Sequence, residues 1–356
     1  MSSRTSIALA GFFAVFAAAC SAASEQPGPG PVVPEGDAGS DATPTPDATP
    51  TPVVPVCDPL APRAVPLVLK VLPDEGEAAL ATEVTKATKS VRVLIYEMGY
   101  GAVLDALKGR AAAKVKVSVI LDVGKKSINQ KYFDQLTAAG AEVHWSDPKF
   151  PYMHAKVMVV DDALAILSTG NYLQSNVLKE RNYVVHDRDP QDVGDIASLF
   201  DADFGGTAPS LDCTRLVVSP VNARARILAV IASAKTTLDI ESMQFADDDV
   251  RTAVADRAKA GVKVRVIVAN PSWIDTNLDA AKFLGSASIP VKYLASPTVH
   301  VKAIVADGER AYVGSENLSW TSLSKNREVG VIFAQQDAIG TMNTTFEKDW
   351  AAGTSF

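Results

Sequence analysis

The chain has 356 residues, of which 47% are hydrophobic and 21% are charged, and its formal net charge is −7. This is an ordinary globular composition, and the length suggests roughly two domains. The acidic balance excludes the strong basic excess expected of a dedicated nucleic-acid-binding protein, although it leaves room for a local basic groove.

Residues 1–20 predict an export signal. Arg4 supplies a positive n-region, and the apolar run that follows, IALAGFFAVFAAA, is shorter than the roughly 20 residues that a transmembrane helix needs. The run ends in small residues before Cys20, as in a lipoprotein signal, whose cysteine is acylated after cleavage. We expect lipidation of Cys20, with ordinary signal-peptidase cleavage near the same alanines as the alternative.

Residues 21–57 predict a disordered linker. The segment is rich in Pro, Gly, Thr and Asp and holds few large apolar side chains, so it cannot bury enough surface to offset the cost of ordering. A lipidated cysteine followed by such a tether predicts an exported domain held near a membrane. Without lipidation, the protein would be secreted or periplasmic.

Two further cysteines, Cys57 and Cys213, flank the first folded half. Export permits disulfides. A bridge between these two residues would pin the start of the folded part to the junction between its halves. Buried free thiols are the alternative.

The rest of the chain is an internal duplication, with halves predicted at residues 58–210 and 211–356. KSVRVLIYEMGY (89–100) resembles KTTLDIESMQF (235–245), and AAAKVKVSVILDV (111–123) resembles KAGVKVRVIVANP (259–271). The offset stays near 146 residues, so one supersecondary plan is used twice.

Each half alternates predicted strands and helices. The Val/Ile runs are nearly continuous, which indicates strands buried on both faces, and the alternation predicts an α/β fold with helices covering mixed sheets. The expected strands are 91–96, 115–121, 157–160 and 165–168, with counterparts at 238–240, 262–269, 303–305 and 311–314. The clearest expected helices are 103–113, 189–206 and 249–261.

An eighteen-residue pattern occurs once in each half, as HAKVMVVDDALAILSTGN (154–171) and HVKAIVADGERAYVGSEN (300–317). The histidine and lysine are two residues apart, so they face the same side of a strand. A turn at the aspartate and a second strand then return the asparagine towards the histidine. Two facing hairpins would gather two imidazoles, two ammonium groups and two amides.

This set of groups suits cleavage of a phosphodiester. One neutral imidazole would attack phosphorus, and the other, protonated, would give its proton to the departing alkoxide. A phosphohistidine would then await water activated by the second imidazole. Lysine and amide groups would stabilise charge on the phosphoryl oxygens. We expect Asp161 and Asp307, at strand ends, to fix turns through backbone hydrogen bonds.

These residues resemble the phospholipase D superfamily, whose signature is HxKxxxxD followed by GSxN, twice per active site. The second copy fits at every position, whereas Ser168 and Thr169 replace the Gly-Ser pair in the first, and Thr keeps the hydroxyl. The resemblance implies two similar α/β/α sandwich halves with mixed sheets and the active site at their interface. It also implies a covalent phosphohistidine, with no metal and no cofactor.

The resemblance further implies an acidic residue that orients a histidine. Glu328 fits this position, while Asn182 stands at the matching position of the first half. If each residue orients the histidine of its own half, Glu328 favours His300 as the general acid/base and His154 as the nucleophile. Apposition across the halves would reverse the orienting residues. The predicted phosphate-binding residues are Lys156, Thr169, Asn171, Lys302, Ser315 and Asn317.

The substrate is less constrained than the chemistry. Aromatic and apolar residues at 148–153 and 270–275, with the tether, favour phospholipid, whereas three lysines on a predicted loop at 124–131 could follow a nucleic-acid backbone. The first hypothesis is an exported, monomeric phospholipase D-type hydrolase of phospholipid head groups. The alternatives are a metal-independent endonuclease, a phosphatidyl transferase of the cardiolipin synthase kind and a non-catalytic binding module. His144 and His186 are predicted to be structural or surface residues.

Overall fold

The computed structural model of the protein describes residues 57–211 and 213–356. The predicted export signal, the lipidation of Cys20 and nearly all of the predicted linker therefore lie outside the described residues. Within the described part, no helix combines the length and apolar character that crossing a membrane requires.

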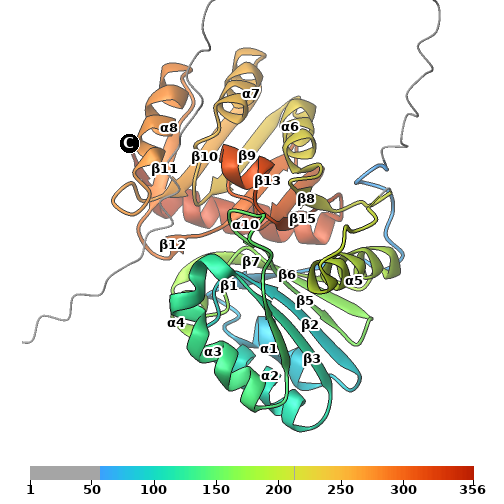
Figure 1. The fold of residues 1–356 in the computed structure, drawn as a ribbon. Helices are drawn as coiled ribbons and strands as arrows, with labels where there is room; N and C mark the ends of the chain where they lie inside the picture. Colours follow the sequence, from blue (N-terminus) through green and yellow to red (C-terminus); the bar gives the residue numbers. More distant parts are fainter. Residues whose placement is uncertain (1–56, 212) are drawn as a thin grey trace, which may run out of the picture. The chain divides into compact units, whose positions relative to one another are not determined.

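The first half is built on a mixed sheet with the strand order β1-β7-β6-β5-β2-β3-β4, to which β12 of the second half adds by pairing with β7 (Figure 1). Strands β2, β3 and β4 are parallel to one another, and the remaining neighbours on the main path are antiparallel. The strands are β1 Val68–Leu72, β2 Ser90–Ile95, β3 Lys116–Leu121, β4 Glu142–Trp145, β5 Lys156–Val160, β6 Leu164–Ser168, β7 Glu180–Asp187 and β12 Thr298–Val299.

The second half repeats this sheet. Its order is β16-β11-β10-β9-β13-β14-β15-β8, and the path from β11 to β8 has the same directions as the path from β4 to β1. The duplication read from the sequence is thus a duplication of topology. The strands are β8 Val217–Ser219, β9 Thr237–Ser242, β10 Lys263–Ala269, β11 Val291–Leu294, β13 Lys302–Ala306, β14 Arg310–Gly314, β15 Glu328–Phe333 and β16 Thr354–Ser355.

Helices cover both faces of each sheet, which gives the expected α/β/α halves. Three helices pack on one face of each sheet, and one long helix packs on the other. The first half has α1 Ala78–Thr85, α2 Ala102–Ala112 and α3 Lys126–Ala138 on one face and α5 Pro190–Gly205 on the other. The second has α6 Ala223–Ser233, α7 Asp248–Lys259 and α8 Thr276–Ser286 opposite α10 Gln336–Ala352. The short elements are η1 Val123–Lys125, α4 Gln174–Val177 and α9 Trp320–Ser324.

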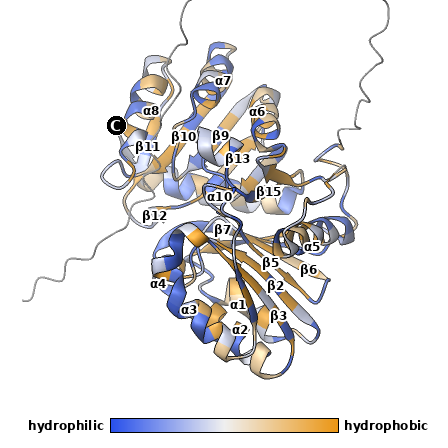
Figure 2. Cartoon of the chain, in the orientation of Figure 1, coloured by the Kyte–Doolittle hydropathy of each residue, from blue (hydrophilic) through white to orange (hydrophobic). Residues whose placement is uncertain are grey.

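The continuous apolar strands follow from this layering. In β5, Val157 and Val159 enter a central core that contains side chains of both halves, while Met158 and Val160 enter the core beneath α1 and α2. Both faces of the strand are therefore buried, as the Val/Ile run predicts. Figure 2 shows apolar strands in the first half and hydrophilic residues on helices such as α3 and α7.

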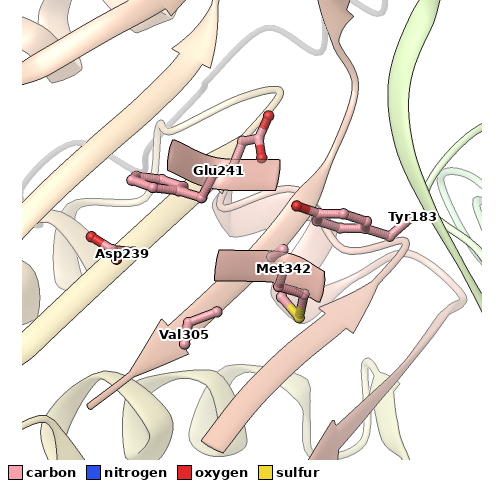
Figure 3. Close-up of a pocket in the computed structure, with 7 residues that line it drawn as sticks. Tyr183, Asp239, Glu241, Val305 and Met342 are labelled. Carbon is pink, nitrogen blue, oxygen red and sulfur yellow. The ribbon is translucent and has the colours of Figure 1, made fainter. Parts of the chain in front are cut away.

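A disulfide and a buried ion pair also join parts of the chain that are distant in sequence. Cys57 and Cys213 form a disulfide with a Cα–Cα distance of 5.1 Å. Deeper in the molecule, Arg181 of β7 makes a two-pronged ion pair with Asp349 of α10, with N–O distances of 2.6 and 3.0 Å. Beside that pair, Tyr183 and Glu241 line a small cavity between the two sheets (Figure 3).

Candidate active site

The motif histidines lie immediately before the first residues of two equivalent strands. Lys156 begins β5 and Lys302 begins β13, each two residues after its histidine. The lysine Nζ atoms donate to the carbonyl oxygens of His154 and His300, at 2.6 and 2.7 Å, which folds each histidine–lysine pair into a compact unit.

The two units meet because each is bonded to the opposite half. The backbone N–H of His154 donates to the carbonyl of Arg327 at 2.8 Å, and that of His300 donates to the carbonyl of Arg181 at 3.1 Å. Lys302 Nζ also reaches across to the carbonyl oxygen of Thr169, at 3.1 Å. The structure therefore brings the two predicted motifs together at the junction of the halves.

The orienting residues are crossed between the halves. His154 Nδ1 lies 2.7 Å from Glu328 Oε2, and His300 Nδ1 lies 3.1 Å from Asn182 Oδ1. The reasoning that gave His300 the carboxylate of its own half is therefore wrong. The physical reason is that β15 and β7 run alongside the histidine of the other half, so their side chains face that histidine.

These contacts define the tautomers. A carboxylate or amide oxygen can only accept a hydrogen bond, so each Nδ1 carries the proton and each Nε2 presents its lone pair. Lys302 Nζ lies 3.3 Å from His300 Nδ1, but the carbonyl oxygens of His300 and Thr169 are its closer acceptors. Glu328 is itself fixed by hydrogen bonds from Ser322 and Asn326.

The site favours uncharged imidazoles. Burial lowers the pKa of His154 to about 4, despite the opposing charge of Glu328. Burial, together with the charges of Lys302 and Lys156, lowers the pKa of His300 well below its ordinary value. Burial alone would raise the pKa of Glu328, but its interaction with His154, the charge of Lys156 and the hydrogen bond from Ser322 hold that pKa below the ordinary value.

The motif asparagines provide polar groups for a ligand. Asn171 and Asn317 are 6% and 7% exposed, and each Oδ1 is buried without a hydrogen-bond partner among the described residues. The two amides occupy equivalent positions in the two motifs, where each can contact a bound polar group. Because the two ends of an amide are interchangeable in placement, these side chains can also present N–H donors to phosphoryl oxygens.

The hydroxyls of Thr169 and Ser315 contact groups of the neighbouring strands. Thr169 Oγ1 donates to Asn182 Oδ1 at 2.8 Å and accepts the N–H of Tyr183 at 3.0 Å. Ser315 Oγ accepts the N–H of Val329 at 3.1 Å. Both residues are fully buried, and their hydroxyls support the neighbouring strands and orienting residues.

The motif aspartates lie at the hairpin turns, away from the histidines. Asp161 accepts the backbone N–H groups of residues 88–90, and Asp307 accepts those of residues 235–237. Both aspartates have positive φ, 54° and 57°. Each therefore ties its turn to the start of the central strand beside it, β2 or β9.

Aromatic side chains differ around the two histidines. Tyr96 contacts His154 edge-on with centroids 4.6 Å apart, and Trp273 stacks on His300 at 6.0 Å. No sequence motif marks Tyr96, although it directly follows the strand β2 at the edge where the motifs meet. Met153 and Ile274, which belong to the stretches 148–153 and 270–275 that favour phospholipid, are buried in the core instead.

The predicted lysine loop at 124–131 is mostly helical, since it comprises η1 and the start of α3. Lys125 pairs with Glu97 at 3.0 Å and lies over the ring of Tyr96. Lys131 lies over Tyr100 and Tyr132. Lys126 lies over the ring of Trp145, so all three lysines of the stretch are held on aromatic rings rather than on an extended loop.

The other two histidines lie outside the site. His144 stacks on Phe204, with centroids 3.9 Å apart, and His186 Nε2 lies 2.7 Å from the carbonyl oxygen of Ala79. Within residues 57–211 and 213–356, no group of three or more His, Cys, Asp or Glu side chains is arranged to hold a metal ion.

Comparisons with known proteins identify the family of the chain. The family described as "Cardiolipin synthase, PLD-like domain" matches residues 80–204 and 227–350, one match in each half. The cardiolipin synthase of Clostridium perfringens (strain 13 / Type A) is 25% identical over 320 residues, which cover 75% of this chain and 66% of that protein. The chain thus spans just under two thirds of the length of this curated relative.

Two solved structures share the fold. Phosphatidylserine synthase of Haemophilus influenzae has a TM-score of 0.63 and 14% identity, and the match covers 83% of this chain and 89% of that one. Polyphosphate kinase of Porphyromonas gingivalis has a TM-score of 0.65 and 17% identity, over 79% and 46% of the two chains. With its paired histidine–lysine motifs and a family match in each half, the chain belongs to the phospholipase D superfamily.

Proposed function

We propose that this protein cleaves phospholipid phosphodiester bonds through a phosphohistidine on His154. The observation that carries the proposal is the crossed pairing of His154 with Glu328 and of His300 with Asn182. This pairing assembles two correctly oriented imidazoles at one junction, beside the two motif lysines.

The roles of the histidines follow from their acceptors. As His154 Nε2 bonds to phosphorus, positive charge develops on its ring, and the carboxylate of Glu328 compensates that charge better than an amide would. The low pKa of His154 keeps the attacking nitrogen unprotonated at neutral pH. His154 is therefore the nucleophile, on different grounds from those read from the sequence.

The reaction has two balanced steps. In the first, the N–P bond forms, the P–O bond to the alcohol breaks, and His300, protonated in the complex, gives its Nε2 proton to the departing oxygen. A bound phosphodiester anion raises the pKa of His300, since a nearby negative charge favours the imidazolium. In the second step, His300 takes a proton from water as that oxygen attacks phosphorus and releases His154.

Several observations support a lipid substrate. Relatives are named cardiolipin synthase and phosphatidylserine synthase, and Trp273 offers an apolar surface next to His300. The export signal and lipid anchor proposed for residues 1–20 would place the site near a membrane. A second candidate is phosphatidyl transfer, in which an alcohol replaces water in the second step. The names of the same relatives favour it.

The test uses the full-length chain and its His154→Ala variant on phosphatidylglycerol vesicles and on supercoiled plasmid, with and without EDTA. We expect phosphatidic acid from the vesicles, with or without EDTA, and a loss of about 10⁴-fold or more in the variant. Cardiolipin as the main product would identify the transferase. Nicked plasmid with intact lipid would support the endonuclease. Unchanged turnover by His154→Ala would refute the phosphohistidine.

A further inference from the structure

The two halves carry the same pair of orienting residues in opposite order. The first half reads Glu180-Arg181-Asn182, and the equivalent segment of the second reads Asn326-Arg327-Glu328. Asn182 and Glu328 contact the histidines, and each lies two residues from the other member of its pair. Because the order is reversed, the carboxylate of Glu328 touches His154, whereas the amide of Asn182 touches His300.

In each pair, the amide of the asparagine is hydrogen-bonded to the carboxylate. Asn326 Nδ2 donates to Glu328 Oε1 at 2.9 Å, behind the contact of Glu328 with His154. Asn182 Nδ2 lies 3.3 Å from Glu180 Oε2, while its Oδ1 holds His300. His154 thus meets a carboxylate backed by an amide, and His300 meets an amide backed by a carboxylate.

Glu180 is close enough to act on His300 directly. Its Oε2 lies 3.8 Å from His300 Nδ1, its side chain is 12% exposed, and Asn176 Nδ2 holds its other oxygen at 2.8 Å. An opposite charge within about 4–6 Å stabilises the protonated form of an imidazole. The carboxylate is therefore placed to support the imidazolium that the departing alcohol requires.

We propose that Glu180 is the positioning residue for the general acid, holding the amide of Asn182 against His300 and supplying the counter-charge to its protonated ring. This inference rests on the proposed phosphodiester chemistry. The reversed order gives the two histidines different proton affinities, with one suited to attack and the other to proton donation.

The charged groups that face Glu180 belong to several elements. Burial raises the pKa of Glu180 to about 7, against the hydrogen bond from Asn182. Lys302 of β13 and Lys156 of β5 also lower it, whereas Glu97, which follows β2, raises it. At neutral pH, Glu180 is thus poised between its two charge states, and a proton on His300 favours the ionised one.

The test changes the position of the negative charge near His300 while keeping the side chains at residues 180 and 182 nearly the same size. Glu180→Gln removes the carboxylate, Asn182→Asp adds one that touches His300, and the double variant transfers it from residue 180 to residue 182. In Glu180→Gln, we expect the apparent pKa of the basic limb of the pH–rate profile to be about one unit lower than in wild type. The double variant should return it to the wild-type position or above.

The leaving group provides an independent readout. p-Nitrophenolate departs without a proton, whereas an alkyl alcohol needs one. Glu180→Gln should therefore lose about tenfold more rate on an alkyl phosphodiester than on a p-nitrophenyl phosphodiester, since one unit of pKa is tenfold in proton affinity. A merely structural role would reduce both rates equally.

Glu142→Gln is the matched control, because Glu142 also places a carboxylate close to an imidazole, with Oε1 3.6 Å from His144 Nε2, but lies outside the site. Its pH–rate profile should match wild type. Equal losses on the two esters, or an unmoved basic limb in folded Glu180→Gln, would overturn the inference. A wild-type protein inactive on both esters would instead refute the proposed function.

Discussion

At the scale of single residues, the site shows how one hydrogen-bond acceptor assigns a chemical role. His154 and His300 occupy equivalent positions before equivalent strands, and Lys156 and Lys302 fold beneath them in the same way. What differs is the group on Nδ1, which is the carboxylate of Glu328 in one case and the amide of Asn182 in the other.

Glu328→Gln should slow the reaction with little change in KM. The variant replaces the charge that compensates His154 as it is phosphorylated, so kcat should fall by about 10²-fold or more. Steady-state kinetics, with rapid-quench detection of phosphohistidine, would measure the effect. A kcat close to wild type would show that the carboxylate has no role in the attack.

Glu316→Gln is the control for that variant. Burial, with the nearby Glu328, raises the pKa of Glu316 to about 8, so this carboxyl is already protonated at neutral pH. Its Oε2 lies 2.7 Å from Tyr312 Oη. An amide closely resembles a protonated carboxyl, and we expect Glu316→Gln to keep near wild-type kcat.

At the scale of elements, each motif is a hairpin whose turn is tied to a neighbouring strand. Asp161 and Asp307 combine a left-handed backbone with acceptance of three successive N–H groups at the start of β2 and β9. Aspartate is among the few non-glycine residues that adopt positive φ readily. The same side chain therefore shapes the turn and fixes the strand that carries the neighbouring active-site loop.

Asp161→Ala should destabilise the protein by about 2 kcal/mol, since the bonds lost are to a charged acceptor. Burial opposes the shift, but the backbone hydrogen bonds lower the pKa of Asp161 to about 2, below its unfolded value near 4. The charge-dependent stabilisation is therefore fully present above about pH 4 and is lost as the pH falls through 2. Urea unfolding of wild type and Asp161→Ala between pH 7 and pH 2 measures this stabilisation. A difference in unfolding free energy that grows as the pH falls would contradict the explanation.

At the scale of the whole described molecule, two repeats are joined through buried charge as well as apolar packing. The central core contains residues from both sheets, and the ion pair of Arg181 with Asp349 crosses it. Glu241 lies beside this pair at the cavity lined by Tyr183 (Figure 3). Burial and the charge of Asp349 raise the pKa of Glu241 to about 8, against Arg181 and Tyr183.

This carboxyl should make the folded protein progressively less stable as the pH rises towards about 8. Its folded pKa is above its unfolded value near 4.3, so its stabilisation is complete below that value and is lost as the pH rises through about 8. Glu241→Gln removes the titration. The free energy of unfolding of the variant, relative to that of wild type, should therefore increase by up to about 1.4 kcal/mol per pH unit between pH 6 and 8. Thermal unfolding across pH 6–9 tests this, and parallel curves for the two proteins would contradict it.

The sequence predicts the repeated α/β arrangement and the residues of the site. It predicts less well which orienting residue contacts which histidine. Spacing alone identifies His154, His300 and their lysines, because the same pattern occurs twice at a constant offset. It does not reveal which half supplies the group on each Nδ1. That depends on the backbone bonds from His154 to Arg327 and from His300 to Arg181, which link residues distant in sequence.

Other misses have local reasons. The lysine-rich stretch at 124–131 reads as a loop because it starts with glycine and alternates charged and polar residues, yet tertiary packing of Tyr132 and Leu136 makes it helical. Glu180 carried no signal, since an isolated glutamate before an arginine resembles any exposed strand end. Only comparison of ERN with NRE at equivalent positions would have singled it out.

Covalent fusion of the repeats has a consequence for how such a pocket can diverge over generations. In an assembly of two identical chains, any replacement at the acceptor position would appear beside both imidazole rings at once, so neither ring could specialise. Here codons 182 and 328 mutate independently, so two nearly identical halves can place different acceptors beside their two imidazole rings. A single polypeptide thereby permits a division of labour that a homodimer with identical chains cannot encode.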